Sequence, residues 1–196
     1  MPLEAEGSRL IRIGGGSGEH PLLFTGVSIL APRAIERIPP GTRSLVDDLW
    51  LPLLAEGRER IGVVFHEGTF FDLGTPADVV SASMAALESG RDFDPAEGFF
   101  DRRAKVLAAD PEAVSSGVER SVVGRARVAA GARSESSVLL DGADLREGST
   151  VTGSLVGPVR VEPGEIVDGM FLWPGETGVV RMPLHDSSQR RAPAVK

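Results

Sequence analysis

Cysteine and tyrosine are absent from this chain of 196 residues, and lysine occurs only as Lys105 and Lys196. Without cysteine, the chain can form no disulfide, no thiolate metal site and no cysteine nucleophile. The three histidines, His20, His66 and His185, lie far apart and form no His-x-x-His or His-Glu-x-x-His motif. These absences exclude enzymes with a catalytic thiol, and they exclude metal sites built on a local histidine motif.

Charge and hydropathy narrow the possible partners further. The chain has 21 basic and 28 acidic residues, a net charge of −7. An acidic chain binds polyanions poorly, so we expect neither nucleic acid nor an anionic membrane as partner. No apolar run approaches the roughly 20 residues that span a bilayer, and Met1–Glu6 carries no secretory signal pattern. The sequence therefore predicts a cytoplasmic protein.

Glycine is abundant, with 24 residues, and 41% of the chain is hydrophobic. This composition is typical of an ordered chain with many turns and argues against disorder. The first half alternates predicted strands and helices. We expect strands at Arg9–Ile13, Leu22–Leu30 and Ile61–His66, a glycine-rich loop at Gly14–Gly18, and a short extended piece at Thr69–Asp72.

Two helices are predicted in the first half. Ser44, three residues before Asp47, indicates a helix start, and Gly57 indicates its end. Pro52 is expected to split or kink this helix. The residues of this helix that would face the core are Leu45, Leu49, Leu53 and Leu54. Its two adjacent carboxylates, Asp47 and Asp48, are better explained as a solvated first turn than as a catalytic acid/base pair.

The second predicted helix begins at Thr75 and continues to about Ser89. Thr75 is placed as the N-cap, Pro76 fits the first helical position, and Asp78 stands three residues after the cap. Val79, Val80, Met84 and Leu87 would face a core.

The second half contains an internal repeat. Ser121 and Ser154 each precede two aliphatic residues and a glycine, and Ser137 precedes three aliphatic residues, Asp141 and Gly142. The serines are spaced by 16 and 17 residues. A coil of three short strands that turns at such glycines cannot bury its own apolar row, so coils must stack. The repeat predicts a parallel β-helix; the alternative is a short β-meander whose spacing is coincidental. Met170–Trp173 would cap the last coil, and Gly178–Met182 would add a final strand.

Two motifs, Phe24-Thr25-Gly26-Val27-Ser28-Ile29-Leu30 and Asp72-Leu73-Gly74-Thr75-Pro76, occur in this order before the repeats. In this arrangement the chain resembles the sugar-1-phosphate nucleotidyltransferases, the nucleotide-sugar pyrophosphorylases that include mannose-1-phosphate guanylyltransferases. The resemblance covers roughly residues 8–169. It implies an α/β fold: the C-terminal part of a Rossmann-like nucleotidyltransferase domain, followed by a short left-handed parallel β-helix of hexapeptide repeats.

The resemblance also implies a division of the chain. Residues 1–90 would form the partial nucleotidyltransferase domain, 91–105 a connector, 106–180 the β-helix with its cap, and 181–196 a flexible tail. The family's triphosphate-binding loop, its first metal-binding aspartate and its Glu-Lys-Pro type segment have no counterpart in this sequence. The chain therefore looks like the C-terminal portion of such an enzyme and is expected to be inactive alone.

Family members join a nucleoside triphosphate to a sugar-1-phosphate, form an NDP-sugar and release pyrophosphate. The resemblance implies that Asp72 is one of two aspartates that hold Mg²⁺, and that Thr25 and Gly26 approach the sugar phosphate. Thr75 and His66 are further candidates near that site. Each has a structural alternative: a turn cap for Asp72, packing for Gly26, a helix start for Thr75 and a surface position for His66.

Three function classes remain open. The first is the nucleotidyltransferase itself, and the second is a non-catalytic sugar-nucleotide-binding or assembly subunit, which the missing loop favours. The third, a hexapeptide-repeat acyltransferase, would need a histidine in or beside the coils, and residues 105–180 contain none. Unpaired strand edges in a partial domain predict aggregation, a homo-oligomer or a complementary N-terminal portion as partner.

Overall fold

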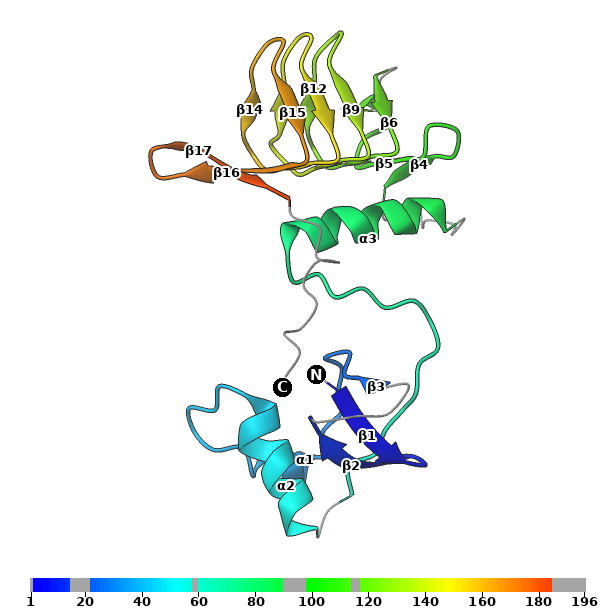
Figure 1. The fold of residues 1–196 in the computed structure, drawn as a ribbon, viewed down its shortest axis with the longest axis vertical. Coiled ribbons are helices and arrows are strands. Elements are labelled where there is room, and N and C mark those ends of the chain that lie inside the picture. Colours follow the sequence, from blue (N-terminus) through cyan, green and yellow to red (C-terminus); the bar gives the residue numbers. More distant parts are fainter. Residues whose placement is uncertain (1, 15–21, 58–59, 90–97, 114–116, 185–196) are drawn as a thin grey trace, which may run out of the picture. The chain divides into compact units, whose positions relative to one another are not determined.

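The computed structural model describes residues 2–14, 22–57, 60–89, 98–113 and 117–184, which divide into two compact units (Figure 1). The first unit is Met1–Phe70 and the second is Phe71–Lys196. The second predicted helix therefore belongs with the repeats. Most of the predicted glycine-rich loop, residues 15–18, lies outside the described residues, as does most of the predicted tail.

The first unit contains a small antiparallel sheet with the strand order β2-β1-β3. Its strands are β1 (Pro2–Glu6), β2 (Arg9–Ile13) and β3 (Leu22–Leu23). Gly7, in the left-handed region with a φ of 56°, makes the turn between β1 and β2. The predicted strand over Arg9–Ile13 is confirmed.

The predicted buried strand over Leu22–Leu30 is wrong beyond its first two residues. Only Leu22 and Leu23 pair with β1, and Ile29 is 99% exposed. The predicted strand over 61–66 is reduced to one bridge, between Gly62 and Arg9, and residues 69–72 form no strand. An apolar run becomes a strand only where a neighbour pairs with its backbone. Around the bridge, the Leu10 N–H donates to the Ile61 carbonyl and the Val63 N–H to the Ser8 carbonyl, and beyond these contacts no strand of the described residues pairs with the predicted runs.

The first predicted helix forms in two pieces, a π-helical turn Val46–Trp50 and helix α2 (Leu51–Glu56). A short helix α1 (Pro32–Ile35) precedes them. Ser44 accepts from the Asp47 N–H (3.2 Å), as predicted. Pro52 stands in the first turn of α2 and lacks an N–H, which accounts for the break. Gly57 ends α2 with a φ of 66°, confirming the predicted cap.

Helix α3 (Pro76–Glu88) opens the second unit and confirms the second predicted helix. The Thr75 hydroxyl accepts from the Asp78 N–H (3.2 Å) and donates to the Asp78 carboxylate (2.7 Å). This reciprocal cap fixes the first turn of α3.

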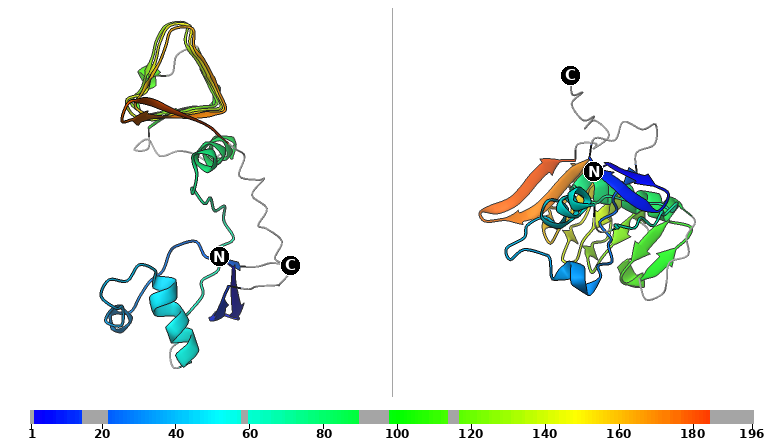
Figure 2. Two further views of the ribbon diagram at one scale, coloured as in Figure 1. Left: turned by 60° about the vertical axis from the view of Figure 1, so that its left-hand side comes forward. Right: turned by 90° about the horizontal axis from the view of Figure 1, so that it is seen from below.

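A parallel β-solenoid of about four turns follows, and Figure 2 shows its three-sided coils end-on. The largest sheet has the order β17-β16-β13-β10-β7-β5-β4, and two further sheets have the orders β14-β11-β8 and β15-β12-β9-β6. The strands are β4 (Phe99–Asp101), β5 (Val106–Ala108), β6 (Val118–Glu119), β7 (Val122–Val123), β8 (Arg127–Val128), β9 (Arg133–Glu135), β10 (Val138–Leu139), β11 (Asp144–Leu145), β12 (Thr150–Thr152), β13 (Leu155–Val156), β14 (Arg160–Val161), β15 (Ile166–Asp168), β16 (Met170–Gly175) and β17 (Gly178–Pro183).

The repeat predicts the register of these coils correctly. Val122 pairs with Val138, and Val138 with Leu155, in parallel, which rules out the β-meander. Leu155 in turn pairs with Phe171. Met170–Trp173, predicted as a cap, thus continues the largest sheet as part of β16. Within the predicted connector, Phe99–Asp101 form β4, which pairs with β5.

The repeated serines form a hydrogen-bonded ladder inside the solenoid. Ser121, Ser137 and Ser154 are buried. Each hydroxyl donates to the carbonyl two residues earlier, of Glu119 (2.7 Å), Glu135 (2.8 Å) and Thr152 (2.7 Å). Each also accepts from an N–H of the next coil, of Ser137 (3.3 Å), Ser154 (3.1 Å) and Met170 (3.0 Å). The ladder satisfies backbone groups at a buried corner, which explains the serine at this position of each repeat.

The residue before each ladder serine, and before the equivalent positions Val106 and Met170 in the first and last coils, adopts a left-handed conformation. The φ angles are 53° at Lys105, 44° at Arg120 and 51° at Ser136, and glycine takes over at Gly153 (53°) and Gly169 (59°). A non-glycine residue in this region costs about 1–2 kcal/mol. The first coils therefore hold strained corners that the later coils relieve with glycine.

Aliphatic side chains fill the solenoid, with Leu139, Leu145 and Leu172 fully buried. The largest sheet is also apolar on its outer face, where α3 covers it. Val80 of α3 packs with Val138 and Leu155 of that face. The solenoid and its helix therefore form one folded body with two apolar layers.

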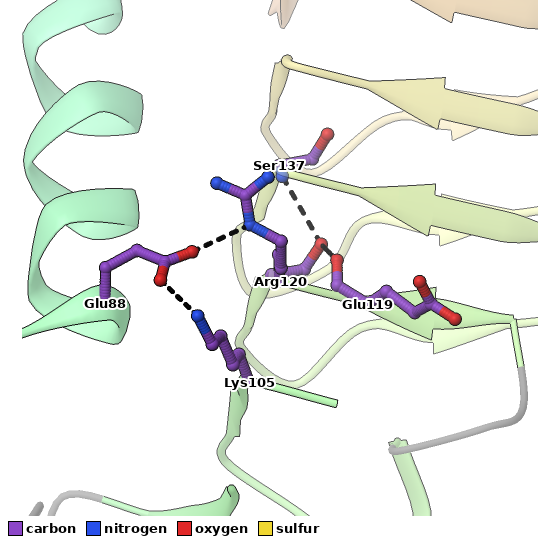
Figure 3. A network of polar contacts seen from close by, with 6 residues as sticks. Glu88, Lys105, Glu119, Arg120 and Ser137 are labelled. Atoms are coloured by element: carbon purple, nitrogen blue, oxygen red, sulfur yellow. Dashed lines mark hydrogen bonds and ion pairs between the residues drawn. The ribbon is translucent and has the colours of Figure 1, made fainter. Parts of the chain in front are cut away.

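A charged cluster joins the end of α3 to the strained corners (Figure 3). Glu88, the last residue of α3, pairs with the Lys105 ammonium and, at 3.0 Å, with Nε of Arg120. Both cations belong to left-handed corner residues. The cluster fixes the C-terminal end of α3 against the first coils.

The cluster predicts a pH dependence. The hydrogen bond from Lys105 holds the pKa of Glu88 below its ordinary value, and the charges of Lys105 and Arg120 add to this. A carboxyl with a lowered folded-state pKa stabilises the fold fully above its unfolded pKa of about 4.3 and loses that contribution as pH falls through the folded pKa. We expect the protection factors of the amides at the end of α3, which are corrected for the pH dependence of intrinsic exchange, to fall below about pH 4.

Glu88→Gln should remove that part of the acid sensitivity. Burial acts most strongly on the pKa of Glu165 and raises it, but the hydrogen bonds from Arg181 and the Glu162 N–H and the charge of Arg181 together outweigh burial, so this pKa is lowered too. The difference between wild type and Glu88→Gln isolates the Glu88 contribution. Equal acid dependence in the two proteins would contradict the role of this cluster.

Candidate functional site

The first unit contains an open cavity of about 1000 Å³. The segments around Phe24–Ala34 and Arg60–His66 line much of it, together with β1, β2 and the helical residues Trp50 and Leu53. Phe24 meets the Trp50 ring edge-on, with centroids 4.8 Å apart, at a small core that includes Leu53. The cavity is thus an apolar concavity of a size that suits a small-molecule ligand.

Two of the predicted site residues, Thr25 and His66, line this cavity. Thr25 is half-buried and His66 is exposed. Gly26 follows Thr25 with a φ of 85°, and no atom lies within 4 Å of the point where a Cβ would stand. A side chain there would be strained by the backbone, and the open space leaves the backbone accessible to a ligand.

Three arginines, Arg33, Arg37 and Arg60, also line the cavity. Arg37 is held by a bidentate pair with Glu56, at 2.6 and 2.8 Å. Guanidinium groups at an apolar concavity suit phosphate recognition. Sequence reasoning missed them: they carry no motif, and Arg37 lies beyond the end of α1 at Ile35.

The other two predicted site residues, Asp72 and Thr75, belong to the second unit. Thr75 is occupied by the cap of α3. Asp72 is exposed. A Cβ added at Gly74 would lie 3.8 Å from Asp72 Oδ1 and 3.9 Å from Asp78 Oδ2. The carboxylates of Asp72 and Asp78 therefore flank Gly74, and Asp78 is committed to Thr75.

The described residues contain no group of three or more His, Cys, Asp or Glu side chains placed to hold a metal ion. At the turn before α3, Asp72 is the one carboxylate that no group among the described residues engages. Mg²⁺ binds through one or two carboxylates, substrate phosphates and water. Asp72 suits that donor set but provides only one part of it.

Among the described helices, none is both long and apolar enough to cross a membrane. No protein-family model matches the chain, and a search of curated proteins finds no match.

Proposed function

We propose that the chain is the C-terminal portion of a sugar-1-phosphate nucleotidyltransferase, which makes an NDP-sugar from a nucleoside triphosphate and a sugar-1-phosphate. The turn Asp72–Pro76 carries the proposal. It begins a helix that is capped by Thr75 and Asp78 and packed on a three-sided solenoid, and it leaves Asp72 exposed, with no partner among the described residues. The resemblance implies this same order of turn, helix and coils. It also implies that the solenoid is left-handed.

The first unit supports an incomplete catalytic domain. Ile29 is 99% and Val64 96% exposed, and among the described residues neither belongs to a strand or a bridge. Apolar segments of this kind are ordinarily covered by strands or helices. We propose that a complementary polypeptide segment covers them and supplies the triphosphate loop.

In the proposed reaction, Mg²⁺ would reduce the repulsion between the attacking sugar phosphate and the triphosphate. In the second unit, Asp72 would contribute one carboxylate to hold Mg²⁺. In the first unit, Thr25 and the open backbone at Gly26 would approach the sugar phosphate, as the resemblance implies. We therefore expect the 196-residue chain alone to have no activity.

The test is the native assembly isolated from its source cells. Its intact mass is measured, and pyrophosphate release is assayed with a panel of nucleoside triphosphates and sugar-1-phosphates. We expect a species heavier than 20.7 kDa that releases pyrophosphate, and no release by the isolated chain. A native assembly without pyrophosphate release for any pair would overturn the proposal.

A second candidate is a non-catalytic subunit that binds a sugar nucleotide. The arginines at the apolar cavity favour it. In that case the isolated chain binds an NDP-sugar saturably, as titration calorimetry would show, and Arg60→Ala weakens binding while Arg127→Ala, on the solenoid, leaves it unchanged. Pyrophosphate release by the native assembly would exclude a purely non-catalytic role.

A further inference from the structure

The hairpin of β16 and β17 extends away from the coils at the end of the solenoid (Figure 1). β17 is the terminal strand of the seven-stranded sheet, and all six of its residues are exposed. A terminal strand of this length is a template for pairing with another chain unless it is protected.

Among the described residues, the main chain of β17 has hydrogen-bonding groups without partners on its outer edge. The Leu172 carbonyl accepts from the Gly157 N–H of the neighbouring coil (2.8 Å), so Leu172 directs its polar groups away from β17. Arg181 stands opposite Leu172. In an antiparallel pair of strands, hydrogen-bonded residue pairs alternate with pairs whose N–H and C=O groups point away from each other. Arg181 and Val179 belong to pairs of the second kind, so their N–H and C=O groups point away from β16, toward the outer edge. Within the described part of the chain, no backbone group pairs with these two residues on that edge.

This edge is complementary to itself. If a second copy pairs antiparallel with its two-fold axis at Val180, Val179 of each copy lies opposite Arg181 of the other. Each of these two residue pairs then exchanges both of its N–H···O=C hydrogen bonds, which satisfies all four outward groups of the pair. A register centred on Arg181 instead sets two arginines opposite each other, which is unfavourable. Symmetry and charge thus select the register centred on Val180.

The side chains agree with that register. Trp173 stands opposite Val180 and Phe171 opposite Met182, and Phe171 stacks with Trp173 at 5.8 Å. Trp173, Val180 and Met182 are 41%, 40% and 47% exposed. Two-fold pairing would place the two Val180 side chains between the two Trp173 rings and join both apolar strips into one.

Charge does not oppose the contact. Arg181 is the one charged residue in β17, and the Glu165 carboxylate of the same chain pairs with it. The edge carries no lysine and no bulge, and proline occurs only at its last residue, Pro183. Natural sheet edges use lysines, prolines and bulges to prevent pairing with another chain, and β17 lacks this protection before its last residue.

We propose that β17 is a homodimer interface, in which a second copy pairs antiparallel across Val180 to form one sheet with the strand order β16-β17-β17-β16. The contact is smaller than a standard interface of roughly 1,200–2,000 Å². We therefore expect a reversible dimer with a dissociation constant on the order of micromolar. This inference does not depend on the proposed function.

Cysteine cross-linking tests the register directly, because the chain has no cysteine. Across the two-fold axis, the two Val180 residues form a non-hydrogen-bonded pair with Cα atoms about 4.5 Å apart, which suits a disulfide. We expect Val180→Cys to form a covalent dimer under mild oxidation at least tenfold faster than Ile166→Cys, an exposed position on β15. Met182→Cys, two residues along the same face, should be slow as well.

Sedimentation velocity of the full chain over a concentration series gives the second readout. Wild type should dimerise, Val180→Lys should weaken the dimer at least tenfold, and the matched control Ile166→Lys should not. The highest concentration tested should be about 100 µM, two orders of magnitude above the expected dissociation constant. A wild-type protein that is still monomeric there would overturn the proposal. So would a dimer in which Val180→Cys cross-links no faster than Ile166→Cys, because another surface would then hold it.

Discussion

Leu139→Ala should destabilise the solenoid by about 2–5 kcal/mol, the range for a buried leucine replaced by alanine. Leu139 is fully buried in the middle coil. It stands between Val123 and Val156 of the adjacent coils. Backbone hydrogen bonds on three sides hold the coils at their spacing, so the walls cannot collapse into the cavity. The lost side chain therefore leaves most of its volume empty.

The effect should extend beyond the mutated coil, because each coil is stabilised chiefly by its neighbours. Urea denaturation followed by circular dichroism gives the change in free energy of unfolding, and hydrogen exchange resolves it by strand. Ile166→Ala is the matched control: Ile166 is 77% exposed on the outer face of β15, and we expect a change within about 0.5 kcal/mol. A loss below about 1 kcal/mol for Leu139→Ala would mean that the coils repack.

The solenoid could be predicted from the sequence because each of its coils repeats one local pattern. The spacing of Ser121, Ser137 and Ser154 gives the register directly, and the structure confirms it. The cap at Thr75 and the glycine end at Gly57 are equally local, since each depends on residues within one turn. What the pattern did not indicate is the role of the serines, whose hydroxyls bind the next coil.

The first unit could not be predicted in the same way. The run Leu22–Leu30 has strand-forming residues throughout, but strand pairing depends on a partner far away in sequence, and only two residues find one. The site shows the same limit. Thr25 was identified by resemblance and His66 by its nearness in sequence to Asp72, and both line one cavity, whereas the arginines beside them carry no motif. The Rossmann-like arrangement stays a prediction that a completed assembly would test.

Asp72→Asn should lower pyrophosphate release by the native assembly about a hundredfold, if Asp72 holds Mg²⁺ as proposed. A metal ion contributes several kcal/mol of charge stabilisation to the transition state, and each 1.36 kcal/mol is a factor of ten in rate. Asparagine keeps the shape of the side chain and removes its charge. The exposed position of Asp72 outside α3 means that the fold should tolerate the change.

The thermal midpoint of the Asp72→Asn assembly should stay at the wild-type value, and the Mg²⁺ concentration for half-maximal rate should rise. Asp168→Asn, at an exposed aspartate on β15, controls for loss of one negative charge and should leave both unchanged. Asp78→Asn should show the opposite pattern to Asp72→Asn: Asp78 accepts from the Thr75 hydroxyl, so stability should fall while the Mg²⁺ dependence is kept. If Asp72→Asn keeps most of the wild-type rate at low Mg²⁺, the carboxylate serves only the local turn and the metal must be held by other residues.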